Sequence, residues 1–136
     1  MNILLVEDEP ELSQLAAESI QNMGHKVLTV TGVQGALEAL KDEKNDIGLM
    51  IADHRLPDGW GVALVLESRI KYPRLKVAVV SGVLTPENVD LLEEYNIPYW
   101  HKPVIYSKVL RALLRPPPPP VREDNTIGPF PKDGKQ

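Results

Sequence analysis

The chain has 136 residues, of which 43% are hydrophobic and 25% charged, a composition typical of one globular domain. It contains no cysteine, which excludes a disulfide framework, a thiolate nucleophile and a cysteine-ligated zinc site. The net charge of −4 disfavours direct nucleic-acid binding, because phosphate recognition requires a basic face. No apolar run approaches the roughly 20 residues of a membrane span, and the acidic start is not that of a signal peptide. We therefore expect a cytoplasmic domain without membrane insertion.

The prolines divide the chain into two parts. Seven of the thirteen lie between Pro116 and Pro131, and five of these are consecutive. We expect residues 1–115 to fold as one domain, and residues 116–136 to be a proline-rich disordered tail or a truncated linker. The consecutive prolines predict a polyproline II rod of roughly 15 Å, at about 3.1 Å per residue. The second part is too short to hold an effector domain.

Five short apolar runs alternate with five segments of helical spacing. The runs cover residues 3–6, 26–30, 47–52, 76–80 and 97–100. Consecutive β-branched and bulky apolar residues are typical of parallel strands covered on both faces. The helices are predicted over residues 12–23, 33–40, 60–71, from Thr85 onward, and 105–114. This alternation predicts an α/β domain with a parallel sheet and helices on both faces.

Polar residues follow four of the five predicted strands, at the edge where open parallel sheets bind ligands. Glu7 and Asp8 follow the first strand, Asp53 the third, Ser81 the fourth and Lys102 the fifth. If the first and third strands are neighbours, the three carboxylates converge and repel one another unless a cation lies among them. Carboxylates without cysteine or clustered histidine favour Mg²⁺, with Mn²⁺ as an alternative.

The same strand ends suit a phosphoryl group. The Lys102 ammonium and the metal would neutralise phosphoryl oxygens, the Ser81 hydroxyl would donate a hydrogen bond, and one carboxylate would be the nucleophile. Each residue alone has an ordinary structural interpretation, such as a helix start or a solvated loop. Their joint placement is what predicts aspartyl phosphate chemistry.

The chain resembles the receiver domains of two-component and phosphorelay response regulators, with the chemotaxis regulators as the nearest type. The matching segments are ILLVEDEP (3–10), DHRLPDGWG (53–61), VSG (80–82) and KP (102–103), within a resemblance that covers about residues 2–114. It implies a flavodoxin-like (βα)5 fold, doubly wound, with strand order 2-1-3-4-5. The chain would be either a single-domain regulator or a receiver excised from a hybrid kinase.

By this resemblance, Asp53 is the phosphoacceptor, Ser81 the conserved hydroxyl and Lys102 the invariant lysine. Tyr99 matches the aromatic residue that turns inward when the hydroxyl residue moves toward the phosphoryl group. The bond before Pro103 is often cis in the family.

The resemblance also implies the metal ligands. Asp8 and Asp53 would hold Mg²⁺ directly with the main-chain carbonyl of Arg55, and Glu7 would act through water. Glu7 replaces the commoner aspartate of the family. Ile105 stands where a capping aspartate is frequent, so the last helix is expected to start without a side-chain acceptor.

The implied function is that of a signalling phosphoacceptor, which is no enzyme beyond its own phosphorylation and dephosphorylation. The donor would be a histidine kinase or histidine phosphotransfer protein. A downstream protein would bind the surface of helix 4, strand 5 and helix 5, and dimerisation linked to phosphorylation is a further expectation. The alternative is a pseudo-receiver that binds partners without phosphorylation.

Two other activities on similar folds are disfavoured. A flavin carrier needs a phosphate-binding loop after the first strand, where Glu7 and Asp8 would repel phosphate. An aspartyl phosphatase needs a second aspartate two residues after the nucleophile, where Arg55 stands.

The remaining histidines and aromatic residues are ambiguous. We expect packed imidazoles at His54 and His101 and a surface position for His25. Trp100 is expected in the core. Tyr95, Tyr99 and Tyr106 fit a partner surface and a core role about equally.

Overall fold

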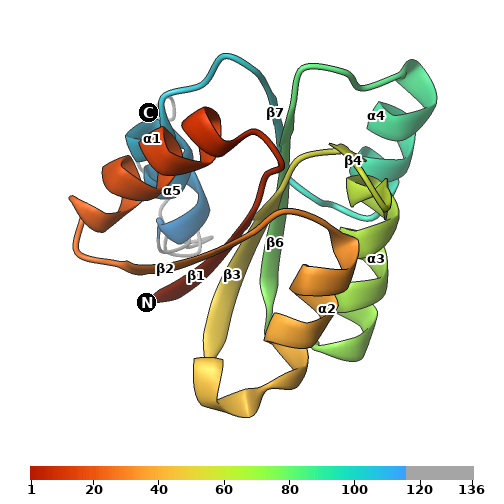
Figure 1. Ribbon diagram of the computed structural model, residues 1–136. Coiled ribbons are helices and arrows are strands. Elements are labelled where there is room, and N and C mark those ends of the chain that lie inside the picture. Colours follow the sequence, from red (N-terminus) through yellow and green to blue (C-terminus); the bar gives the residue numbers. More distant parts are fainter. Residues whose placement is uncertain (116–136) are drawn as a thin grey trace, which may run out of the picture.

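A computed structural model describes residues 1–115, so the predictions for residues 116–136 lie outside the described part of the chain. Figure 1 shows one parallel sheet between two layers of helices. Its strands are β1 (Asn2–Val6), β2 (Lys26–Val30), β3 (Ile47–Ala52), β6 (Lys76–Ser81) and β7 (Tyr99–His101). The spatial order is β2-β1-β3-β6-β7, which confirms the predicted order 2-1-3-4-5 of the five main strands.

In the described part of the chain, five α-helices connect and cover the strands. They are α1 (Pro10–Gln21), α2 (Val33–Lys41), α3 (Gly61–Lys71), α4 (Pro86–Glu94) and α5 (Tyr106–Leu114), with a 3₁₀ turn η1 (Glu43–Asn45). In Figure 1, α1 and α5 lie on one face of the sheet, while α2, α3 and α4 lie on the other. Within residues 1–115, no helix combines the length and apolar character needed to cross a bilayer.

The central strands are buried on both faces, as their uninterrupted apolar runs predict. In β1, Ile3 and Leu5 pack in the cluster with Ile20 of α1 and Leu110 of α5. The intervening residue Leu4 packs in the opposite cluster, with α2 and α3. Successive side chains of a strand point to opposite faces, so both faces of β1 must be apolar.

Several element boundaries differ from the predictions for physical reasons. The first helix starts at Pro10 rather than at residue 12, because the fixed φ of proline suits the first helical position. The last strand starts at Tyr99 rather than at residue 97, because the Ile97 amide closes the end of α4 on the Leu92 carbonyl at 2.8 Å. A short antiparallel hairpin, β4 (Arg55–Leu56) and β5 (Gly59–Trp60), follows β3 and was not predicted.

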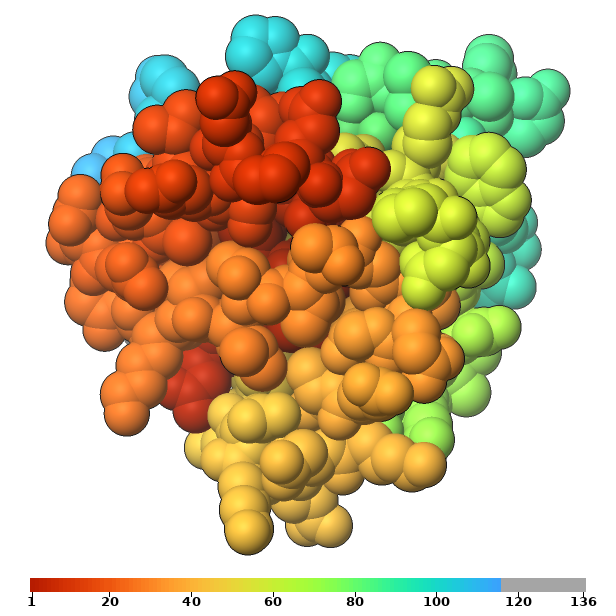
Figure 2. All heavy atoms as spheres, in the orientation of Figure 1, coloured from red at the N-terminus to blue at the C-terminus, as the bar shows by residue number. Residues whose placement is uncertain are grey.

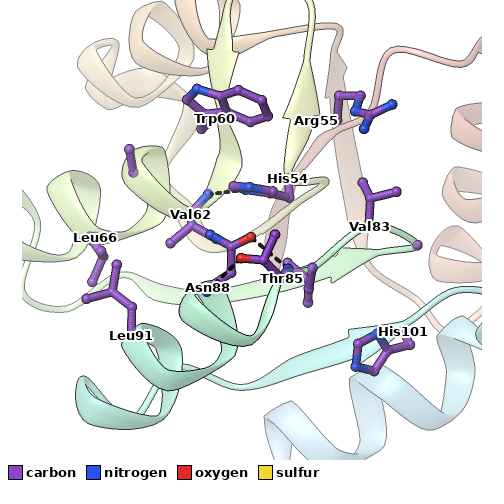
Figure 3. Close-up of a pocket in the computed structure, with 13 residues that line it drawn as sticks. His54, Arg55, Trp60, Val62, Leu66, Val83, Thr85, Asn88, Leu91 and His101 are labelled. Carbon is purple, nitrogen blue, oxygen red and sulfur yellow. Dashed lines mark hydrogen bonds between the residues drawn. The ribbon is translucent and has the colours of Figure 1, made fainter.

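The predicted cap of the fourth helix, the missing cap of the fifth and the cis proline bond are confirmed. Thr85 caps α4: its Oγ1 accepts from the Asn88 amide at 3.1 Å, while Asn88 Oδ1 accepts from the Thr85 amide at 3.0 Å (Figure 3). Ile105 precedes α5 without a side-chain cap, and the bond between Lys102 and Pro103 is cis.

The histidines divide between the core and the surface. His54 is buried, as expected. His101 is exposed and meets the Tyr99 ring edge-on, so the expectation of a packed imidazole is wrong there. His25 is partly buried with its Nδ1 atom inaccessible, which corrects its expected surface position.

The aromatic residues near the carboxyl end of the domain also differ in burial. Trp100 and Tyr106 are partly buried and pack against the cluster beneath α1 and α5. Tyr95 is 46% exposed. Of these three residues, Tyr95 therefore offers the most surface to a partner.

Candidate functional site

Strand pairing brings the predicted site residues to one edge of the sheet. Val6 pairs with Ala52, and Ser81 of β6 pairs with His101 of β7, so the residues that follow these strands are neighbours. The Asp53 amide donates to the Val6 carbonyl at 3.0 Å, which continues the β1–β3 ladder into the site. The carboxyl ends of adjacent parallel strands thus meet here.

Three carboxylates converge at this edge. Glu7, Asp8 and Asp53 each offer an oxygen within 4.8 Å of the others. Glu7 is 4% exposed, Asp53 is partly buried and Asp8 is exposed, so the cluster opens to solvent on the Asp8 side. An all-carboxylate donor set with one open side fits a hard divalent cation such as Mg²⁺.

Lys102 balances part of this negative charge. Its Nζ donates to Glu7 Oε1 at 2.5 Å and to Asp53 Oδ2 at 2.8 Å. Burial alone lowers the pKa of Lys102, but the hydrogen bonds and charges of Asp53 and Glu7 outweigh burial and raise that pKa well above its usual value. Lys102 is therefore a permanent cation at neutral pH.

Asp53 is held through both of its carboxylate oxygens. Oδ2 accepts from Lys102, and Oδ1 accepts from the His54 main-chain amide at 2.6 Å. Tyr106 lies near the same charges, and burial raises its pKa to about 12, with Lys102 opposing and Glu7 adding to the rise. Tyr106 therefore stays a neutral phenol. Asp53 is oriented by two hydrogen-bond donors, the Lys102 ammonium and the His54 amide.

Ser81 and Tyr99 occupy the neighbouring strands. Ser81 is fully buried at the end of β6, where its Oγ accepts from the Val83 amide at 3.3 Å. Tyr99 is tied to α4, because its hydroxyl donates to Glu93 Oε2 at 2.8 Å. This hydrogen bond raises the pKa of the Tyr99 hydroxyl. Tyr99 thus lies beside the site without joining the carboxylate cluster.

His54 anchors the loop after Asp53 to α3, a role that sequence reasoning missed. Its Nδ1 accepts from the Val62 amide in the first turn of α3 at 3.2 Å (Figure 3). Burial lowers the pKa of His54, although the charge of Asp53 opposes this shift. A neutral imidazole keeps Nδ1 free to accept. The alternation of side chains along a strand predicts the packing of His54 but not its partner.

The hairpin after Asp53 carries Arg55, whose main-chain carbonyl is a predicted metal ligand. Arg55 pairs with Trp60 across the hairpin, and the Arg55 side chain is exposed. Trp60 is 59% exposed and lies over His54, with ring centroids 5.1 Å apart. A groove of about 660 Å³ lies between this hairpin, α3 and α4, and Figure 3 shows its labelled lining residues.

The sequence matches a family model over most of its length. The model, described as response regulator receiver domain, covers residues 3–113. The chain is 33% identical over 112 residues to the response regulator protein PilR of Pseudomonas aeruginosa, covering 82% of this chain and 24% of PilR. It is 28% identical over 116 residues to the sensory/regulatory protein RpfC of Xanthomonas campestris pv. campestris, covering 81% of this chain and 16% of RpfC. The chain thus spans less than a quarter of either relative.

Solved structures share the fold. A receiver domain protein (CheY-like) from Methanospirillum hungatei superposes with a TM-score of 0.74 at 22% identity, covering 82% of this chain and 88% of that protein. A response regulator from Burkholderia pseudomallei, with a phosphorylated aspartic acid, calcium ion and citrate, has a TM-score of 0.75 at 20% identity. The match covers 84% of this chain and 66% of that protein. The fold agrees with these neighbours and the family model spans nearly the whole described domain, so the chain belongs to the response regulator receiver domain family.

Proposed function

We propose that this chain is the phosphoacceptor of a two-component system, in which Asp53 takes a phosphoryl group from a partner's phosphohistidine in a Mg²⁺-dependent reaction. One observation carries this proposal: the Lys102 ammonium bridges Asp53 and Glu7 beside a cluster of three carboxylates. The B. pseudomallei neighbour, which contains a phosphorylated aspartic acid and a calcium ion, supports aspartyl phosphate chemistry on this fold.

In the proposed reaction, an Asp53 carboxylate oxygen forms a bond to phosphorus as the nitrogen–phosphorus bond of the phosphohistidine breaks. The released imidazole keeps the electron pair of that bond and takes up a proton. Lys102 would remain charged and stabilise the phosphoryl oxygens, and we propose that the Ser81 hydroxyl, at the end of the neighbouring strand β6, donates to one of them. A bound Mg²⁺ would neutralise further phosphoryl charge.

The metal ligands we propose are Asp8, Asp53 and the Arg55 main-chain carbonyl, with Glu7 acting through water. Glu7 already accepts from Lys102 and from the Glu9 amide at 3.2 Å, which leaves it less available for direct coordination. Mn²⁺ would suit the same oxygen donors.

The direct test is phosphorylation of the Asp53→Asn variant. In acetyl phosphate and Mg²⁺, the unaltered chain should gain one phosphoryl group, seen by mass spectrometry as about 80 Da, and the variant should gain none. Asp46→Asn is the matched control, because Asp46 lies beyond η1 with a φ of 48°, a conformation that asparagine tolerates. Undiminished uptake by the Asp53 variant would contradict the proposal.

We propose that the Tyr99–Glu93 hydrogen bond holds the switch aromatic in its outward position. Glu93→Gln keeps an acceptor but removes its charge, which weakens the hydrogen bond by about 0.5–1.5 kcal/mol, so the phosphorylation rate should rise by about two- to tenfold. The reason is that the outward and inward positions of Tyr99 are in equilibrium. Destabilising the outward position increases the population of the inward position, which phosphorylation also favours. Glu94→Gln removes an adjacent exposed carboxylate of the same helix and should leave the rate unchanged. Equal rates in the two variants would exclude this role of Glu93.

The proposed phosphodonor is a histidine kinase or a histidine phosphotransfer protein, and the proposed output surface comprises α4, β7 and α5. Phosphotransfer profiling against the source organism's kinases would identify the donor. The similarity to the sensory/regulatory protein RpfC supports a hybrid kinase as one source of such a domain. If Asp53 is phosphorylated by none of them and Mg²⁺ does not bind, the pseudo-receiver alternative replaces the proposal.

A further inference from the structure

The turn of the hairpin after Asp53 is hydrogen-bonded to a helix far away in the sequence. Asp58 Oδ1 accepts from the Val33 amide at 2.7 Å, and Asp58 Oδ2 accepts from the Gln34 amide at 2.9 Å. Both amides belong to the first turn of α2, whose N-cap residue Gly32 provides no side-chain acceptor. A carboxylate 24 and 25 residues away therefore supplies the missing cap.

Glycine at position 32 is what admits the Asp58 carboxylate. A Cβ atom on Gly32 would lie 2.5 Å from Asp58 Oδ1, too close for both to keep their places. The φ of Gly32 is −166°, an extended conformation open to any residue, so glycine is needed here for space. Gly59 of the hairpin also approaches α2 closely, because a Cβ atom on Gly59 would lie 2.9 Å from Val33 Cγ2. Figure 2 shows the yellow hairpin directly beside the orange α2.

The loop is also anchored at its other side. The Gly61 amide donates to the His54 carbonyl at 2.7 Å, and the His54 ring caps α3 through Val62. Arg55 lies between this anchor and Asp58, in the first strand of the hairpin. The path of its main chain is therefore set by α3 on one side and by α2 on the other.

We propose that Asp58 is a positioning residue for the metal site: by capping α2 it holds the hairpin so that the Arg55 carbonyl faces the carboxylate cluster. This inference rests on the proposed function, which makes that carbonyl a metal ligand. The hydrogen bonds from Gln34 and Val33 lower the pKa of Asp58, so the capping carboxylate is ionised throughout the physiological range. Groups that orient a ligand commonly contribute a factor of ten or more to metal affinity.

The test is a Mg²⁺ titration of four variants, in which tryptophan fluorescence reports binding. Asp58→Ala removes both the contact and the charge, whereas Gly32→Ala keeps the charge and displaces the carboxylate. Each should weaken Mg²⁺ binding by about tenfold, and the double variant should bind no more weakly than either single variant, because both act through one contact. Asp42→Ala is the matched control: Asp42 caps η1 through the Lys44 amide at 3.0 Å, away from the site.

The outcomes separate a positioning role from other roles. Thermal unfolding in the absence of Mg²⁺ reports the loss of a cap, which Asp58→Ala and Asp42→Ala share, while Mg²⁺ affinity should fall only when the Asp58 contact is broken. Weaker binding in Asp58→Ala but not in Gly32→Ala would show a charge effect and overturn the inference. Equal affinity in all variants would also overturn it and leave the proposed function standing. Absence of Mg²⁺ binding by the unaltered chain would overturn both.

Discussion

Lys102→Met is expected to destabilise the metal-free protein by about 2–4 kcal/mol at pH 7. Breaking a buried ion pair costs about 3–5 kcal/mol, and the partial solvent access of Lys102, 21% exposed, places the value toward the lower end. The loss arises because Glu7 and Asp53 then face each other and Asp8 without a cation, and Glu7 is only 4% exposed. Urea unfolding in EDTA measures the difference. Mg²⁺ should recover part of it by supplying a positive charge.

The pH dependence of this difference follows from the raised pKa of Lys102. A lysine whose pKa is higher in the folded state contributes its full stability below its unfolded value of about 10.4 and loses it as the pH rises further. The difference in free energy of unfolding between the unaltered protein and Lys102→Met should therefore be constant near neutral pH. It should become smaller above about pH 10. Lys108→Met removes an exposed lysine of α5 and controls for net charge. A similar loss in both variants would contradict a specific role of Lys102.

Gly61→Ala is expected to cost about 3 kcal/mol or more and to weaken Mg²⁺ binding. A Cβ atom at position 61 would lie 1.8 Å from the Asp53 carbonyl oxygen and 2.9 Å from His54 Cα. Both are main-chain atoms, so no side-chain rotation relieves the overlap. The variant must displace the loop that carries Asp53, which links the stability loss to a loss of site geometry.

Gly82→Ala is the matched control at the same edge of the sheet. Its added Cβ would meet only Lys102 Cβ, at 4.0 Å, which is an ordinary contact. We expect the free energy of unfolding of this variant to lie within about 0.5 kcal/mol of that of the unaltered protein. Thermal or urea unfolding of the two variants compares them directly. A Gly61 variant as stable as the Gly82 variant would exclude the close approach as a constraint.

Element identity was predictable because it depends on local patterns. The apolar run of β3 and the capping signal at Thr85 each place an element without knowledge of its neighbours. Boundaries were less predictable where a residue serves two elements. Ile97 has the composition of a strand residue, but its amide completes the last turn of α4.

The meeting of Glu7, Asp53 and Lys102 was also predictable from sequence, because residues that follow parallel strands share one edge of the sheet. Their order along the chain therefore indicates their proximity once the strand order is known. The hydrogen bond from Tyr99 to Glu93 was not predictable, since it depends on how α4 packs beside β7.

The sequence by itself determined the class of fold, the edge at which the charged residues gather and the oxygen-donor character of that site, because strand and helix periodicity and side-chain chemistry are local properties. Only the tertiary structure decided how the loop after Asp53 is held. The cap of α3 by His54 and the cap of α2 by Asp58 join residues from separate segments. Such contacts follow from the packing of helices on the sheet, and a sequence pattern does not specify them.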